Sequence, residues 1–242
     1  MPRALPVVAL AIGLALRPST LLGQAAAKTT LRDGLEKSRE DRAADPAAVS
    51  AFARLASAYG TPLYVYDQGS IVRQARAVRE AFAARFPKLK IHYAVKANTS
   101  LAILGLLRAE GVSAEVVSEG EIRAARAVGI PGSDIMFTSS SKSPSELRTA
   151  LETGAVLNVD SRDELEQVEV MAAKAGKVVS VSFRINPGVD PHTIHQINTG
   201  ISESKFGLHL EDGLALAAYD RAKAHAPDDD EGSMIAIVSK PK

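Results

Sequence analysis

The chain has 242 residues, of which 46% are hydrophobic and 24% charged, with ordinary numbers of Gly and Pro. These values exclude a collagen-like, low-complexity or disordered chain and allow a sizeable core in one large or two small domains. The net charge of +1 provides no overall field for nucleic acid or anionic lipid, so we do not expect nucleic acid as a partner. The absence of cysteine excludes disulfides, a cysteine nucleophile and cysteine-ligated zinc within the chain.

A short apolar segment distinguishes the amino-terminus. Residues 4–16 are all apolar or small, follow Arg3 and end at Arg17 and Pro18. The run is shorter than the roughly 20 residues of a membrane-spanning helix, and its basic start and the small residues after it are typical of a targeting segment. We therefore predict a signal-like or targeting segment over residues 1–27, although a buried helix or a start codon set too far upstream would give the same pattern.

The targeting prediction has consequences for location. The segment would direct the protein to an organelle such as a plastid or into the secretory route, and without it the protein would be cytoplasmic. Residues 28–48 mix basic, acidic and small residues and are interpreted as a linker. No other run approaches membrane-spanning length, so we expect no membrane span in the mature chain.

From residue 49 onward, short β-rich runs alternate with amphipathic stretches. The predicted strands are Leu63–Tyr66, Lys90–Val95, Ala114–Val117, Ile135–Thr138, Val156–Val159 and Val178–Ile185. The predicted helices are Ile71–Arg85, Leu101–Ala109, Glu119–Ala127, Ser145–Glu152 and Arg162–Ala175. Ser145 and Ser161 stand where a helix start favours serine, and glycines follow four of the helices at Gly111, Gly129, Gly154 and Gly176.

This alternation predicts an α/β fold with a parallel sheet whose faces are covered by helices. Two architectures satisfy it, an open doubly wound sheet and a (β/α)₈ barrel. No Gly-x-Gly-x-x-Gly follows the first strand, which disfavours a dinucleotide-binding sheet.

Lys96 is the first residue that could carry chemistry. It follows the predicted strand Lys90–Val95, and the carboxyl ends of parallel barrel strands face the active site. A desolvated lysine loses its proton more easily and forms Schiff bases with carbonyl compounds. A solvated lysine at the end of a strand would give the same pattern.

Other polar residues lie at similar places. Arg184 ends a predicted strand and is suited to bind phosphate or carboxylate, and the glycine-marked loop 199–207 suits a binding face. The acids Glu115, Glu119 and Glu121 could serve in acid–base chemistry or as first-turn charges of a helix. His192 and His195 are three residues apart but have no third ligand nearby, so we predict no metal site.

Four blocks together resemble a known family. They are TPLYVYD (61–67), YAVKAN (93–98), AEVVSEGE (114–121) and RINPGVD with TG and SKFG (184–207). In this order they resemble the fold-type III pyridoxal-phosphate decarboxylases, and among these the diaminopimelate decarboxylases. The resemblance extends from Tyr59 to His225. The ornithine branch typically has a cysteine after the lysine and lacks the Asn-Pro after the arginine, which favours the diaminopimelate branch.

The resemblance implies roles for individual residues. Lys96 would be the catalytic residue and would hold pyridoxal phosphate through a Schiff base, with Glu115, Glu121 and Arg184 around the cofactor. Lys142 matches a lysine of the family to which we assign no role. The implied enzyme is a carbon–carbon lyase that decarboxylates a small amino acid, meso-diaminopimelate, to lysine. A related ornithine- or arginine-type decarboxylase and a non-catalytic truncated homologue are the alternatives, and the intact family implies a homodimer.

The resemblance also implies a fold and its limits. It predicts a TIM-barrel type (β/α)₈ fold, the alanine racemase-like barrel that binds pyridoxal phosphate, with residues 49–226 forming part of it. Residues 227–242 resemble nothing in the family and are interpreted as a divergent acidic tail. We therefore expect a truncated barrel, a fragment without the family's carboxy-terminal β-domain, because about five strands cannot close an eight-stranded barrel.

Overall fold

The computed structural model describes residues 9–11, 46–86, 88–188, 206–210, 212–224 and 237–238. The chain divides into two compact units. The larger contains Met1–Gly13 and Ile71–Pro241, and the smaller contains Leu14–Ser70 and Lys242.

The smaller unit contains helix α2 (Pro46–Tyr59) and the first turn of α3 (Gln68–Ala83). Helix α2 begins inside the predicted linker 28–48. The predicted strand Leu63–Tyr66 is wrong, because these residues have no regular secondary structure and their side chains are exposed. Aromatic and β-branched residues favour a strand only where a neighbouring strand takes up the backbone hydrogen bonds, and no described strand pairs with this segment.

The larger unit is built on an eight-stranded sheet. Its strands are β1 (Ala9–Ala11), β2 (Lys90–Ala94), β3 (Ser113–Val116), β4 (Ile135–Phe137), β5 (Val156–Val159), β6 (Val181–Asn186), β7 (Leu208–His209) and β8 (Ile237–Val238). Strands β1 to β7 lie in chain order, β8 pairs with β6, and every pairing is parallel. Five predicted strands are thus confirmed as β2 to β6.

The strand order distinguishes the two architectures left open by the sequence. A doubly wound sheet reverses its order at a switch point, whereas β1 to β7 follow one another without reversal, as in a (β/α) barrel. Among the described residues no pairing joins β7 back to β1, so the sheet is a half-barrel. Strand β1 lies within the predicted targeting segment, whose role stays a prediction.

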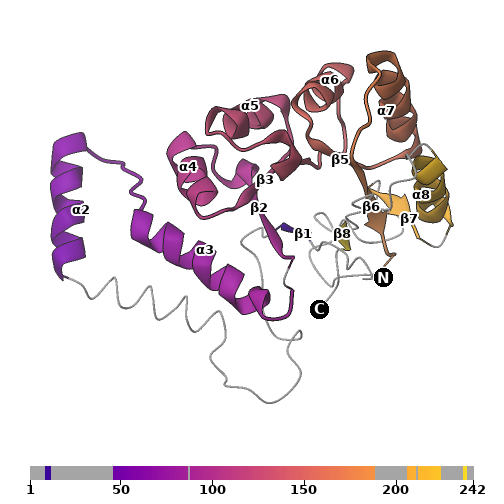
Figure 1. The fold of residues 1–242 in the computed structure, drawn as a ribbon. Helices are drawn as coiled ribbons and strands as arrows, with labels where there is room; N and C mark the ends of the chain where they lie inside the picture. The colour runs from indigo at the N-terminus through magenta and orange to yellow at the C-terminus, as the bar shows by residue number, and fades with distance from the viewer. Residues whose placement is uncertain are drawn as a thin grey trace. The chain divides into compact units, whose positions relative to one another are not determined.

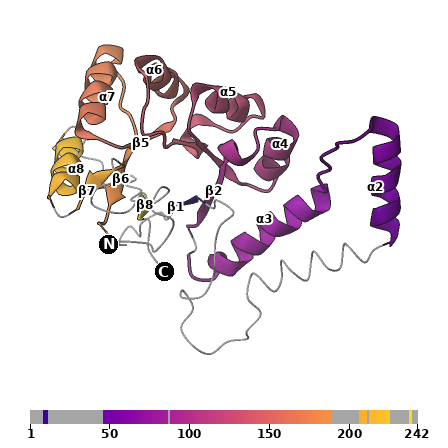
Figure 2. The same ribbon diagram turned by 180° about the vertical axis from the view of Figure 1, so that it is seen from behind.

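Five helices follow the strands along one face of the sheet, and both views show them as a row (Figures 1 and 2). They are α4 (Leu101–Ala109), α5 (Glu119–Ala127), α6 (Pro144–Thr153), α7 (Arg162–Ala175) and α8 (Leu214–Ala224). Two short 3₁₀ turns, η1 (Val95–Ala97) and η2 (Gly132–Asp134), precede α4 and β4. None of the described helices is both long and apolar enough to cross a membrane.

A recurring Ser-x-x-Glu pattern starts three of these helices. Ser118, Ser143 and Ser161 each accept a hydrogen bond from the backbone N–H of the glutamate three residues on, which satisfies one of the free donors at a helix start. The predicted start at Ser145 is therefore wrong. Pro144 takes the first helical position, where its missing N–H costs nothing, and this moves the cap to Ser143.

The two faces of the sheet differ in polarity. Because side chains alternate along a strand, one set faces the helices and forms the core with them; it includes Val116, Phe137 and Leu157. The opposite set includes six buried polar residues together with the buried apolar Ala94 and Met136; the polar ones are His92, Ser113, Glu115, Asn158, Ser182 and Asn186. The parallel register places these residues on one face by pairing His92 with Ser113 and Asn158 with Ser182. Polar groups buried there mark the inner face of the half-barrel as the place to look for chemistry.

Candidate active site

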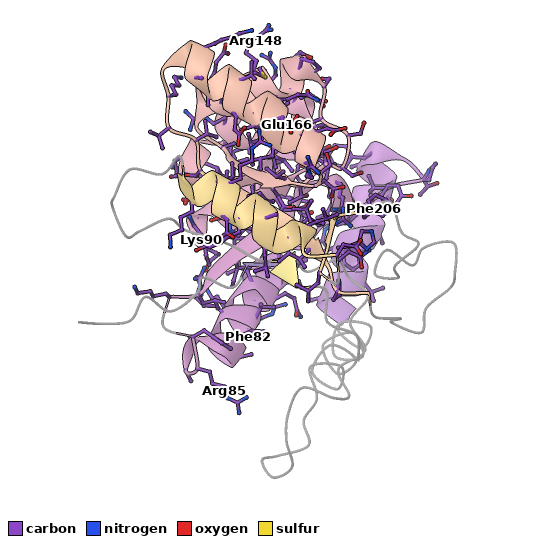
Figure 3. The ribbon with its side chains drawn as sticks, turned by 90° about the vertical axis from the view of Figure 1, so that its right-hand side faces the viewer. Phe82, Arg85, Lys90, Arg148, Glu166 and Phe206 are labelled. Carbon is purple, nitrogen blue, oxygen red and sulfur yellow. The ribbon has the colours of Figure 1, made fainter. Side chains whose placement is uncertain are left out.

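The carboxyl edge of the half-barrel gathers polar side chains from five consecutive strands. Each lies in the last half of its strand or just beyond its end: Lys96, Glu115, Thr138, Asp160 and Arg184. In Figure 3, Phe206, which lies beside Arg184, is at the opposite edge from Lys90, the first residue of β2. The edge beside Arg184 is the carboxyl edge, at which parallel barrels place their active sites.

Lys96 and Glu115 form the centre of the site. The Lys96 Nζ donates to both carboxylate oxygens of Glu115, at 3.2 Å each. The Glu115 side chain is 3% exposed, whereas that of Lys96 is 54% exposed. Thr138 Oγ1 donates a further hydrogen bond to Glu115 Oε1. A buried carboxylate therefore holds a lysine amine that stays open to an incoming molecule, and it can exchange a proton with that amine.

The local sequence explains how Lys96 reaches this position. Strand β2 ends at Ala94, and the turn η1 follows, closed by a hydrogen bond from Asn98 N to Val95 O. The Tyr93 hydroxyl also donates to the carbonyl of Asn98, at 3.3 Å. Because Val95 is buried in the core, the turn is anchored while Lys96 projects at the edge of the sheet.

Arg184 lies on β6, three strands along the sheet from Glu115 on β3, and has contacts of its own. Its Nη1 donates to Asp160 Oδ1 at 3.2 Å, and its guanidinium carbon lies 4.6 Å from the centre of the Phe206 ring. The Gly207 N–H donates to the second oxygen of Asp160 at 3.3 Å. Gly207 has φ +75°, and a Cβ there would lie 2.8 Å from the carbonyl of Arg184, so this close approach requires glycine. The end of the predicted loop 199–207 thus reaches the site, while residues 199–205 lie outside the described residues.

The other two candidate acids, Glu119 and Glu121, make contacts that stabilise the local structure. Glu121 Oε2 accepts a hydrogen bond from Val117 N at 2.8 Å, which ties the start of α5 to the end of β3. Glu119 forms an ion pair with Arg123 one turn along α5. The structure therefore joins Lys96 to Glu115 but gives Glu121 and Arg184 other partners, and the implied role of these two at the cofactor stays a prediction.

Thr138 and Asp160 were missed in the sequence analysis. Asp160 directly follows β5 and so shares the strand-end position of Lys96. From the sequence alone, Asp160 is interpreted as part of the turn before Ser161, because Asp-Ser is an ordinary helix start. Thr138 closed a predicted strand, and only its pairing with Glu115, 23 residues away, shows that it belongs to the site.

Metal ligands form no cluster in the part of the chain that the structure describes. No group of three His, Asp or Glu side chains lies within coordinating distance there. His192 and His195 lie outside these residues.

His92 is a buried titratable group on the inner face. Its Nδ1 lies 3.2 Å from the carbonyl of Ala114, and its Nε2 has no hydrogen-bond partner among the described residues. Burial is the main cause that lowers the pKa of His92 below its usual value of 6.5. As the pH falls below 6.5, the unfolded chain binds a proton at this position, whereas the imidazole of the folded chain stays neutral. The free energy of unfolding therefore decreases until the pH reaches the folded pKa of His92.

We therefore expect His92→Gln to lose less unfolding free energy between pH 7 and pH 5 than the unaltered chain. Urea denaturation at the two pH values measures the difference. Ser182→Ala is the control, because it alters the same buried polar face but removes no titratable group, so the pH dependence should stay as it was. Equal pH dependence in His92→Gln and the unaltered chain would contradict the assignment.

The chain is similar to proteins of one enzyme family. The family model for the pyridoxal-binding domain of pyridoxal-dependent decarboxylases matches residues 68–226. Among curated relatives, the diaminopimelate decarboxylase of Zymomonas mobilis is 43% identical over 191 residues, which cover 76% of this chain and 45% of that protein. That of Bacillus subtilis is 42% identical over 169 residues, 69% of this chain and 38% of the relative. The chain therefore spans less than half the length of these relatives.

Solved structures show similarity to the same family. Diaminopimelate decarboxylase from Helicobacter pylori, complexed with L-lysine, matches with a TM-score of 0.66 and 38% identity over 72% of this chain and 44% of its own. The enzyme from M. jannaschii in complex with L-lysine matches with a TM-score of 0.65 and 34% identity, over 76% of this chain and 42% of its own. These similarities confirm the predicted TIM-barrel type α/β fold, of which the described sheet is an open part.

Proposed function

The chain belongs to the pyridoxal-dependent decarboxylase family, whose pyridoxal-binding domain it carries over residues 68–226, and on this premise we propose that it serves in the decarboxylation of meso-diaminopimelate to lysine. The observation that carries the proposal is the pair at the carboxyl edge. There the exposed amine of Lys96 lies 3.2 Å from both oxygens of a buried carboxylate. Relatives named diaminopimelate decarboxylase at 37–43% identity support this substrate.

The residues present fit pyridoxal phosphate. An aldehyde needs a reachable amine, and Lys96 has more than half of its side chain exposed. An anionic group needs a cation with fixed geometry, and Arg184 is held by Asp160 and Phe206. When bound, the cofactor supplies a conjugated ring that takes up the electron pair left as carbon dioxide departs.

The chain's own residues would position these groups and move protons. Glu115 orients the Lys96 amine and accepts or returns its proton, and Thr138 fixes the carboxylate through Oε1. Arg184 would bind an anionic group of the cofactor or the substrate. Glu121 would act indirectly, since its carboxylate holds the backbone N–H of Val117 at the end of β3.

Two further parts of the proposal rest on the sequence. We propose that residues 1–27 direct the protein to an organelle or the secretory route, and that the complete enzyme is a homodimer. An ornithine- or arginine-type decarboxylase is the alternative for the substrate, and a non-catalytic homologue is the alternative for the activity.

The first experiment traps the cofactor on its lysine. The purified full chain is mixed with pyridoxal phosphate, reduced with borohydride, digested and analysed by mass spectrometry. We expect the pyridoxyl group on Lys96, because its amine is exposed and held beside a carboxylate. Lys96→Arg should abolish this label completely.

Lys90 provides a matched control. It lies on β2, the strand that leads to Lys96, is about one-third exposed and pairs with a carboxylate, Asp134, at 2.5 Å, but it lies at the amino end of that strand. Lys90→Arg should leave the Lys96 label unchanged. Labelling spread evenly over surface lysines, or a label that survives Lys96→Arg, would contradict the proposal.

Substrate and activity are tested in a second assay. The chain with pyridoxal phosphate is supplied with meso-diaminopimelate, ornithine or arginine, and the amine products are measured by mass spectrometry. Lysine from meso-diaminopimelate alone supports the proposal. Product from ornithine or arginine instead would support the alternative substrate, and a selective Lys96 label without any product would support the non-catalytic homologue.

A further inference from the structure

Lys142 is a buried lysine that the proposed chemistry does not use. It lies in the loop between β4 and α6, and its side chain is fully buried. Its Nζ donates to Glu164 Oε1 at 2.5 Å and to the carbonyls of Ser139 and Asn158 at 2.6 and 2.8 Å. These three bonds use all the hydrogens of an ammonium group, so Lys142 has none left for a ligand.

Glu164 links this lysine to the end of β5. One of its oxygens holds Lys142, and the other accepts a hydrogen bond from Asp160 N at 3.1 Å. In an ordinary capping box the glutamate would bond to the N–H of the capping serine, as Glu146 does with Ser143. Glu164 instead reaches one residue further back, to the residue that closes the candidate site.

Asp160 connects Glu164 to Arg184 through hydrogen bonds. Its backbone is held by Glu164, while its two carboxylate oxygens accept bonds from Arg184 Nη1 and Gly207 N. The Asp160 side chain is buried and that of Arg184 is about one-quarter exposed. A continuous set of hydrogen bonds thus runs from the buried Lys142 to a guanidinium at the open edge of the sheet.

We propose that Lys142 and Glu164 are positioning residues that fix Asp160 and thereby hold the guanidinium of Arg184 at the candidate site. A buried ion pair contributes little net stability compared with apolar side chains of similar size, so stability alone is a weak reason for placing charges here. Burial is the main cause that lowers the pKa of Lys142 and raises that of Glu164. The use of Arg184 for a cofactor or substrate rests on the proposed function, whereas the positioning itself does not.

Two double variants separate positioning from stability and from charge. Both Lys142→Met/Glu164→Gln and Lys142→Met/Glu164→Leu remove one positive and one negative charge. The glutamine keeps an oxygen that can accept from Asp160 N, whereas the leucine does not. If the leucine variant fails to fold, Lys142→Met/Glu164→Met replaces it with an unbranched side chain.

The readout is the NMR spectrum of the full chain labelled with ¹⁵N-arginine and free of ligand. Arg184 is assigned by the signal that Arg184→Lys removes. We expect hindered, slowly exchanging guanidinium protons of Arg184 in the unaltered chain and in the glutamine variant, and their loss in the leucine variant. The same signal in all three proteins, or no hindered signal in the unaltered chain, would overturn the proposal.

A second measurement connects the positioning to the proposed function. The pyridoxal phosphate concentration that gives half-maximal borohydride labelling of Lys96 should rise about tenfold in the leucine variant, which corresponds to about 1.4 kcal/mol. It should stay within twofold in the glutamine variant. If the NMR signal distinguishes the variants but this concentration does not, the positioning stands and the assignment of Arg184 to the cofactor is wrong.

Discussion

Lys142→Met is expected to lower the free energy of unfolding by about 3–5 kcal/mol at pH 7, the usual cost of removing one partner of a buried ion pair. The substitution leaves the Glu164 carboxylate nine-tenths buried without its cation. Urea denaturation followed by circular dichroism measures the loss.

The loss should depend on pH in a definite direction. Burial already raises the pKa of Glu164 above its usual 4.5, and Lys142 opposes that rise. Without Lys142 the folded pKa rises further, so the folded variant binds a proton that the unfolded chain releases. The deficit should therefore be smallest below pH 4.5 and should grow as the pH rises through the folded pKa of Glu164.

Two controls accompany this prediction. Lys142→Met/Glu164→Leu should recover most of the lost stability, because neither member of the buried pair is then left without its partner. Arg123→Met breaks the surface pair between Arg123 and Glu119 and should not differ measurably from the unaltered chain. A Lys142→Met variant as stable as Arg123→Met would show that the buried pair is not held as described.

Phe137→Ala is expected to cost about 3–5 kcal/mol, the range for removing a buried phenylalanine side chain. Phe137 is fully buried in the layer between the sheet and its helices, and its ring centre lies 5.4 Å from Lys142 Nζ. The substitution removes core contacts and the aromatic face beside that cation. The midpoint of urea denaturation measures the effect.

Phe86 provides the matched comparison. It follows α3, is 43% exposed and lies 6.3 Å from the ring of Phe82. Phe86→Ala should cost about 1 kcal/mol or less, because much of its surface is already in water. Equal costs at the two positions would contradict the placement of Phe137 in the core.

The sequence by itself determined the local elements and indicated Lys96 as the candidate reactive group. Helices α4, α5 and α7 have the predicted bounds, and β2 to β6 lie within three residues of theirs. These elements follow from hydrophobic periods of two and about 3.6 residues, which are properties of short segments. The YAVKAN block likewise marked Lys96 without any knowledge of its neighbours.

Only the tertiary structure decided which groups meet. The segment Leu63–Tyr66 has strand composition but no partner strand, and β composition is insufficient without one. Glu115 with Thr138, and Lys142 with Glu164, are joined across 23 and 22 residues of sequence. Such pairs depend on how strands and helices align with one another, because hydrogen bonds act over about 3 Å, and no pattern within a single segment encodes that alignment.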